Sequence, residues 1–123
     1  ATDIPLVVLA DGNTASSAEI VTGAIQDADR GKVVGEKTFG TGTVLARFNL
    51  SDGSALSIGT ERWLTRDGRP IWHEGLEPDF KVALPDTVTP VLPDDLKSMT
   101  PAELAASKDA QLLKALEVIK SAN

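Results

Sequence analysis

A serine between a strand-like apolar run and a helix-like segment is the residue of this sequence best placed to do chemistry. Ser16 follows the apolar run of residues 5–10 and precedes a helical pattern that begins at Ala18. A hydroxyl at such a junction lies at the carboxyl end of a buried strand, where α/β sheets bind ligands. The start of the helix supplies free backbone N–H groups and the positive end of a dipole, which stabilise an oxyanion. These features suit a nucleophile that attacks a carbonyl carbon.

A simpler role for the same serine is to cap the helix. Ser16 precedes Glu19 by three residues, which is the spacing of a capping box. The Gly-x-Ser-x-Gly elbow of the α/β-hydrolases is absent from the sequence. A serine also needs a base to become nucleophilic, and the neighbouring sequence supplies no obvious one. From the residues alone, cap and nucleophile are both open.

The composition limits the class of protein. The chain has 123 residues, with 41% hydrophobic and 24% charged, which is typical of one globular domain. A net charge of −6 argues against a nucleic-acid partner. No cysteine is present, which excludes disulfides and thiolate metal sites, and His73 is the single histidine. We expect no cofactor and no metal. No apolar run reaches the length of a membrane span, and the direct start in a strand-like run suggests a piece of a longer protein.

The elements that would position Ser16 form a strand–helix–strand unit. Residues 5–10 predict a fully buried, parallel strand, and residues 18–29 an amphipathic helix that stops at Gly31. Residues 32–35 predict a second buried strand. Two further runs, 43–50 and 55–64, flank a turn signal and predict a hairpin.

The composition then changes near the carboxyl end. Residues 80–84 predict a last short strand, and residues 85–99 contain three prolines and predict a linker. Thr100 and Glu103 form a second capping box, and apolar residues at helical spacing follow it. The sequence therefore predicts three parts: a core of residues 1–84, a linker of residues 85–99 and a helical tail of residues 100–123.

One segment resembles the signature of a known enzyme family. Residues 14–20, Thr-Ala-Ser-Ser-Ala-Glu-Ile, resemble the Thr-Ala-Ser-Ala-Ser-Glu-Ile motif of the C-terminal processing (tail-specific) serine peptidases. The resemblance continues in order through 23–24, 35–40, 50–55, 63–65 and 75–79, so it covers roughly residues 5–83. Such a long ordered series is far more specific than a lone motif.

This resemblance carries expectations about fold and function. It implies an α/β fold with a crotonase-like or ClpP-like spiral core, of which this chain holds the second half. Ser16 is then the nucleophile, and the backbone N–H of Ser17 contributes to the oxyanion hole. The substrates would be protein or peptide carboxyl termini, cut by a protein that is extracytoplasmic, periplasmic or membrane-associated. The family's PDZ domain and upstream half-core are absent here, so this chain alone is expected to be inactive and to pair with another copy through its open sheet edge.

The sequence departs from the family at its catalytic base. The family has a lysine between the two glycines of Phe-Gly-Lys-Gly, and the corresponding residue here is Thr41. A glutamine usually found four residues later, which orients that lysine, is Leu45 here. Threonine does not act as a base at neutral pH, and leucine does not orient one. This double departure indicates a degenerate enzyme or a subfamily with another base.

Three residues of this chain are candidate substitutes for the missing base. Lys37 lies four residues before Thr41 and is a base if desolvation lowers its pKa, although a solvated surface lysine is the simpler interpretation. Asp27 matches a family acid but is expected to be structural, holding a loop or an arginine such as Arg30. Histidine is a common general base, but His73 lies in a turn-rich segment, where an ordinary surface or hairpin histidine is the simpler interpretation.

Three functions follow from these observations. The first is a serine endopeptidase with Ser16 as nucleophile, and the second is a pseudoprotease that binds peptides or serves as a scaffold. The third, a crotonase-type acyl-group enzyme, rests on fold analogy alone, since no CoA-binding signature is present.

Overall fold

The computed structural model describes residues 3–121 and consists of two small sheets and four helices. In chain order the elements are β1 (Val7–Ala10), α1 (Ser17–Asp27), β2 (Lys32–Gly35), β3 (Thr43–Asn49), β4 (Ala55–Arg62), β5 (Phe80–Lys81), α2 (Pro93–Leu96), α3 (Pro101–Ala105) and α4 (Ala110–Ser121). One sheet has the order β1-β2-β5 and the other is the β3–β4 hairpin. The α/β class expected from the sequence is confirmed.

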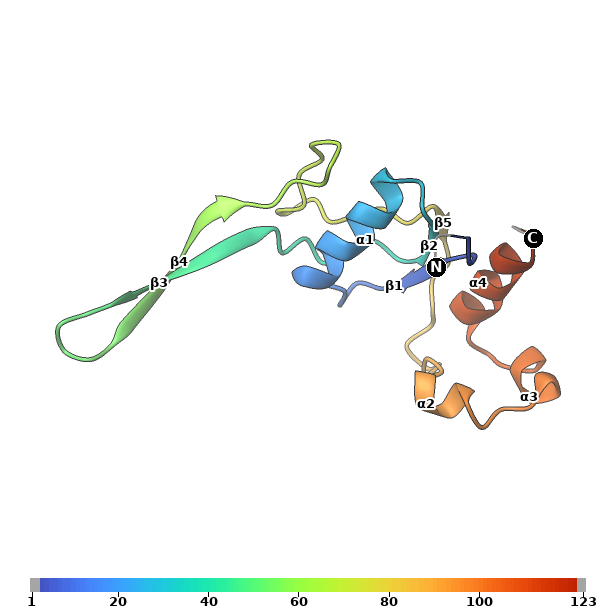
Figure 1. Ribbon diagram of the computed structural model, residues 1–123. Coiled ribbons are helices and arrows are strands. Elements are labelled where there is room, and N and C mark those ends of the chain that lie inside the picture. Colours follow the sequence, from blue (N-terminus) through green and yellow to red (C-terminus); the bar gives the residue numbers. More distant parts are fainter. Residues whose placement is uncertain (1–2, 122–123) are drawn as a thin grey trace.

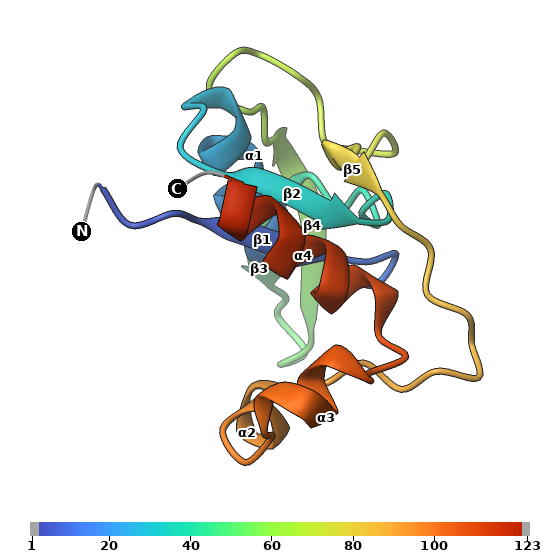
Figure 2. The ribbon, with the colours of Figure 1, turned by 90° about the vertical axis from the view of Figure 1, so that its right-hand side faces the viewer.

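The predicted strand–helix–strand unit is present. β1 and β2 pair in parallel, with Val8 opposite Val33, and β5 adds in parallel on the other side of β2. Figure 2 shows α4 lying across one face of this sheet, while α1 lies behind it. The central strand is therefore covered on both sides, and Val33 and Val34 are almost fully buried.

Two details of the first unit differ from the sequence expectation. β1 is not fully buried: Leu9 is 45% exposed, and within residues 3–121 β1 is an edge strand that pairs only with β2. The helix also ends before Gly31. α1 stops at Asp27, and Asp29 takes the left-handed conformation, with φ of 45°, that turns the chain. Gly31 is needed for a different reason, since a Cβ there would lie 2.7 Å from the carbonyl oxygen of Leu6.

The predicted hairpin is confirmed, and it extends away from the body of the molecule (Figure 1). β3 and β4 are antiparallel, with an irregularity in the register between Val44 and Leu45. Every residue of β4 is exposed, and large apolar side chains such as Phe48 and Ile58 are close to half exposed. A two-stranded ribbon without a covering layer has little stability of its own.

The carboxyl-terminal third packs on the parallel sheet through its last helix. Asp109 is buried and accepts hydrogen bonds from the N–H groups of Leu112 and Val91, both at 2.9 Å. Gln111 donates to the carbonyl of Val82 at 2.9 Å, which ties the start of α4 to the end of β5. The predicted last strand is shorter than expected, since β5 has only two residues.

The remaining tail elements are short. Thr100 caps α3, and its N–H donates to Glu103 Oε2 at 2.7 Å, as the capping pattern predicts. α2 lies within the stretch of residues 85–99 that the sequence indicates as a linker. The division into core, linker and tail stays a prediction. No helix in the described part of the chain is long and apolar enough to cross a membrane.

Candidate active site

The serine singled out from the sequence lies in a strained backbone conformation. Ser16 has φ of 56° and ψ of −123°, which a residue with a side chain rarely adopts. It immediately precedes α1, and the residue is exposed. Such strain is a feature of turns that present a nucleophile at the start of a helix.

Ser16 does not cap the helix with its hydroxyl, so the capping interpretation is wrong for the side chain. No side-chain capping hydrogen bond is present; instead the backbone N–H of Ser16 donates to Glu19 Oε2 at 3.0 Å. Only the glutamate half of the capping box is therefore formed. The Ser16 hydroxyl is left free of the cap and available to a ligand.

The loop before Ser16 is held by a compact set of hydrogen bonds. Asp11 Oδ1 accepts from the Asn13 N–H at 3.0 Å and from the Thr14 hydroxyl at 2.9 Å. Partial burial acts to raise the pKa of the Asp11 carboxyl, but these hydrogen bonds outweigh it and hold the pKa below its ordinary value. The turn into Ser16 is thus fixed by an ionised carboxylate.

A buried carboxylate joins this serine to residues 39–42, Phe-Gly-Thr-Gly, which we call the glycine-rich turn. Glu19 is 0% exposed. Its Oε1 accepts from the Thr38 hydroxyl at 2.5 Å and from the Gly40 N–H at 2.8 Å. Its Oε2 accepts from the Thr41 N–H at 2.8 Å, in addition to the Ser16 N–H. Four donors from two segments therefore converge on one side chain, and the backbone nitrogens of Ser16 and Thr41 lie beside the same oxygen.

The glycine-rich turn is also packed tightly from its other side. A Cβ at Gly42 would lie 2.5 Å from the backbone nitrogen of Trp72, so only glycine fits there. The carbonyl of Gly40 accepts from the His73 N–H at 3.0 Å, and that of Gly42 from the Trp63 N–H at 2.7 Å. The glycine-rich turn is therefore held between α1 on one side and the segments that contain Trp63 and Trp72 on the other.

The two positions at which the sequence departs from the family lie on this turn and on the hairpin. Thr41 is half-buried and is fixed beside Ser16 through its backbone. Leu45 is on β3, just after the register irregularity, and its side chain is 66% exposed. The structure therefore brings position 41 close to Ser16. Neither the threonine at position 41 nor the leucine at position 45 can act as a base.

Ser17, whose N–H the sequence predicts as an oxyanion donor, lies at the start of α1. Ser17 is the first residue of α1, and in the described chain its N–H has no backbone acceptor. An apolar hollow of about 420 Å³ lies against this first turn and is lined by Val8, Leu9, Thr14, Ser17, Ala18, Val21 and Thr22. A free N–H can donate to the carbonyl oxygen of a bound peptide, and an apolar hollow beside it can hold an apolar side chain of that peptide.

The weaker candidate residues have other partners. Lys37 is half exposed, and its ammonium lies 3.5 Å from Glu77 Oε1. This placement does not favour a base, because a proton-accepting lysine needs a desolvated site without a carboxylate partner. His73 is exposed, and its ring packs edge-on against Trp72 with centroids 4.2 Å apart.

Asp27 has the structural position that the sequence suggests, with a different arginine. Its side chain is 3% exposed and forms an ion pair with Arg69, rather than with Arg30. Burial acts to raise the pKa of the Asp27 carboxyl. Hydrogen bonds from Thr65, Asp67 and Arg69, together with the Arg69 charge, outweigh burial and hold that pKa below its ordinary value. Asp27 fixes the 65–69 turn to the end of α1.

The residue that sequence reasoning underestimated is Glu19. Its spacing from Ser16 indicated a local cap, but nothing in the sequence indicated that the same carboxylate binds residues 38–41, about 20 positions away. In the described residues no group of acidic and histidine side chains could hold a metal ion.

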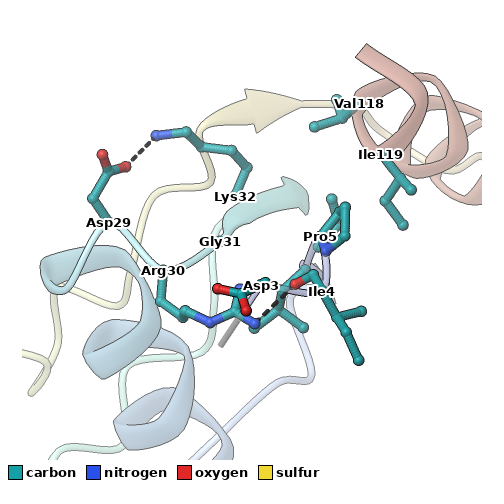
Figure 3. A pocket seen from close by; sticks show the side chains of 11 residues that line it. Asp3, Ile4, Pro5, Asp29, Arg30, Gly31, Lys32, Val118 and Ile119 are labelled. Atoms are coloured by element: carbon teal, nitrogen blue, oxygen red, sulfur yellow. Dashed lines mark hydrogen bonds and ion pairs between the residues drawn. The ribbon is translucent and has the colours of Figure 1, made fainter. Parts of the chain in front are cut away.

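A second hollow of the molecule lies away from these residues. It has a volume of about 320 Å³ and is formed by residues 3–7, the turn before β2 and the end of α4 (Figure 3). Its charged groups are already engaged: Arg30 donates to the Ile4 carbonyl at 2.8 Å, and Lys32 lies 2.6 Å from Asp29. None of the candidate catalytic residues lines it.

Comparisons with known proteins identify the family of this chain. The sequence profile described as Peptidase family S41 matches residues 1–82. A carboxyl-terminal-processing protease of Synechocystis sp. is 37% identical over 119 residues, which cover 97% of this chain and 25% of that protein. The carboxy-terminal processing protease CtpA of Bacillus subtilis is 42% identical over 82 residues, covering 67% of this chain and 18% of that protein.

Solved structures show the same relationship. A photosystem II D1 C-terminal processing protease superposes with a TM-score of 0.69 at 38% identity, covering 89% of this chain and 26% of that one. The tricorn protease, at 21% identity and a TM-score of 0.58, shares the fold. The chain spans about a quarter or less of the length of the curated relatives named here. With the profile match over two thirds of its residues, the chain belongs to peptidase family S41.

Proposed function

We propose that this chain supplies the nucleophile and one oxyanion donor of a serine-type endopeptidase that cuts proteins near their carboxyl termini. The observation that carries the proposal is the conformation of Ser16: strained, exposed, directly before a helix, and with a hydroxyl that does not cap that helix. Family membership supports the same role, since relatives are named for carboxyl-terminal processing.

The proposed reaction is acyl transfer to Ser16. Its Oγ bonds to the scissile carbonyl carbon while its proton passes to a base, and the carbonyl oxygen becomes an oxyanion that the Ser17 N–H stabilises. Collapse breaks the carbon–nitrogen bond, and the departing amine takes up that proton. Water then hydrolyses the acyl-serine ester and restores the hydroxyl.

The base is the part of this proposal that the chain does not supply. Among the described residues no lysine or histidine side chain is hydrogen-bonded to Ser16, and position 41 carries threonine. The proposal therefore requires a base from elsewhere in the full-length protein. It also includes the family's crotonase-like spiral core, whose upstream half completes the site, and an extracytoplasmic or membrane-associated location.

The test is labelling of the full-length protein with a peptidyl phosphonate that reacts with activated serines. We expect one adduct, located on Ser16 by peptide mass spectrometry, and loss of both the adduct and substrate cleavage in Ser16→Ala. The matched control is Ser17→Ala, which removes the neighbouring hydroxyl but keeps the backbone N–H and should still label. Cleavage that persists in Ser16→Ala refutes the assignment.

A second candidate function rests on Thr41 and Leu45. A pseudoprotease keeps the fold and binds peptides, but it has lost the base that cleavage requires. Thr41 and Leu45 fit this description because neither side chain can act as a base or orient one. It predicts no phosphonate adduct and measurable peptide binding in the full-length protein. Turnover gained by Thr41→Lys combined with Leu45→Gln would show that only the base and its orienting partner were lost.

We also propose that the open edge of β1 pairs with another strand, from the upstream core or from a second copy. β1 has a neighbour on one side only, and its Leu9 is partly exposed. Unpaired strand edges recruit partners. A monomeric sedimentation profile of this chain at high concentration would contradict pairing between copies.

A further inference from the structure

A polar hollow at the root of the hairpin lies next to the glycine-rich turn. It has a volume of about 450 Å³ and is lined by Thr43, Leu45, Gly59, Thr60, Glu61, Arg62 and Trp72. Arg62 and Thr43 are direct partners in the β3–β4 ladder, and Leu45 is opposite Gly59. A Cβ at position 59 would lie in ordinary van der Waals contact with Thr43, 3.6 Å away, so glycine at this position leaves out a side chain that would take up part of the hollow.

This hollow is connected to the candidate active site through two short links. Thr43 is two residues beyond Thr41, whose backbone is tied to Ser16 through Glu19. On the other side, Gly42 packs against the backbone of Trp72, which forms one wall of the hollow. Figure 1 shows the hairpin leaving the body of the molecule on the side of the amino-terminal end of α1.

The hollow holds a cationic side chain, Arg62. Among the residues that the structure describes, Arg62 has no carboxylate within ion-pair distance. A guanidinium forms bidentate hydrogen bonds with a carboxylate, and such bonds are among the stronger ones in proteins. Leu45 and Trp72 provide apolar surface beside this charge, while Glu61 contributes a negative charge to the same hollow.

We propose that the hollow binds the free carboxylate and last apolar side chain of a substrate's carboxyl terminus, with Arg62 on the carboxylate and Trp72 and Leu45 on the side chain. This inference rests on the proposed function and adds a recognition site for the end that is released.

The experiment measures binding without turnover. The protein carrying Ser16→Ala is titrated with acetyl-Leu-Ala-Ala bearing a free carboxylate and with the same peptide as its amide, and the Trp72 indole resonance is followed by NMR. We expect the carboxylate form to bind about five- to tenfold more tightly, the range expected for a charge-assisted hydrogen bond weakened by solvent. Equal affinity of the two peptides overturns the proposal.

Variants at neighbouring charges make the test specific. Arg62→Gln should abolish the preference for the carboxylate, and Glu61→Gln should increase it because a repulsive charge is removed. Arg47→Gln is the matched control: it removes an arginine from the same hairpin, outside the hollow, and should change nothing. A preference that survives Arg62→Gln refutes the assignment.

The outcome is separable from that of the proposed peptidase activity. If the phosphonate fails to label Ser16 but the Arg62-dependent preference persists, the chain binds carboxyl termini as a pseudoprotease and the hollow keeps its role. If Ser16 labels and the preference is absent, the peptidase proposal stands and the carboxylate site is wrong.

Discussion

Replacing Glu19 by glutamine should separate the serine from the glycine-rich turn while keeping side-chain volume. Each carboxylate oxygen of Glu19 accepts two hydrogen bonds, one oxygen from Thr38 and Gly40 and the other from Ser16 and Thr41. Glutamine keeps one oxygen, but its NH₂ group would face two donors in a site that is 0% exposed. If the NH₂ group faces the Ser16 and Thr41 N–H groups, two hydrogen bonds are lost. If it faces Thr38 and Gly40, the Gly40 bond is lost, while the Thr38 hydroxyl can turn to accept from the amide.

The expected loss of stability follows from these numbers. A buried donor without its partner costs about 1–3 kcal/mol, and hydrogen bonds to a charged group lie at the upper end of the range. Since the Ser16 and Thr41 N–H groups are partly accessible to water, we expect Glu19→Gln to lower the free energy of unfolding by about 2–4 kcal/mol. At about 4 °C per kcal/mol for a chain of this size, Tm should fall by about 8–16 °C.

The assay is urea unfolding followed by tryptophan fluorescence, with amide hydrogen exchange of residues 38–41. The matched control is Glu103→Gln, which changes the glutamate of the second capping box, where the carboxylate is exposed and bonded to Thr100 alone. That variant should lose less than about 1 kcal/mol. Equal losses in the two variants, or unchanged protection of the Gly40 and Thr41 amides in Glu19→Gln, would refute the central role given to Glu19.

Three further variants test other parts of the site. Gly42→Ala should destabilise by about 1–3 kcal/mol in urea unfolding, since the new methyl group would collide with the Trp72 backbone. Asp27→Asn should make the free energy of unfolding depend less on pH at acid pH. Because the Asp27 pKa is lowered in the folded state, its carboxylate stabilises the fold above about pH 4, and this stabilisation is lost as pH falls through the pKa of the folded state. Ser16→Gly should be about 1 kcal/mol more stable than Ser16→Ala, because glycine tolerates φ of 56°.

Two other residues of this chain provide control variants for Gly42→Ala and Asp27→Asn. Gly12→Ala should be nearly neutral, since a Cβ there has no heavy atom closer than 4.0 Å. Asp94→Asn, at an exposed carboxylate, should leave the acid limb of the profile unchanged. A neutral Gly42→Ala, an unaltered pH profile in Asp27→Asn, or a less stable Ser16→Gly would each contradict the contact that it tests.

The elements of the parallel unit could be predicted because their signals are local. The apolar run 5–10 and the helical spacing of 18–29 located β1 and α1 to within three residues, and 32–35 gave β2 without error. The solvent exposure of the strands was harder to predict. The burial of β1 and of the β3–β4 hairpin depends on which other elements pack against them. Leu9 and Ile58 are apolar and exposed, and no pattern within their own strands indicates that.

The roles of the site residues stay predictions, and only their positions are seen in the structure. The backbone N–H groups of Ser16 and Thr41 donate to the same oxygen of Glu19, although 25 positions separate the two residues in the chain. The capping pattern misassigned the Ser16 hydroxyl, because the spacing of a capping box does not reveal the backbone angles that decide which half forms. The long-range bonds of Glu19 have no signature in local sequence.

The way position 41 is held explains how the site can persist without its base. Glu19 binds the backbone N–H of Thr41, so the tether is independent of the side chain at that position. Gly40 is bound in the same way, and Gly42 is fixed by packing against Trp72. Loss of a lysine here would remove the proton acceptor without releasing the turn from the serine. The geometry is therefore compatible with a lysine placed back at position 41, and the double variant that restores the family residues tests whether chemistry alone was lost.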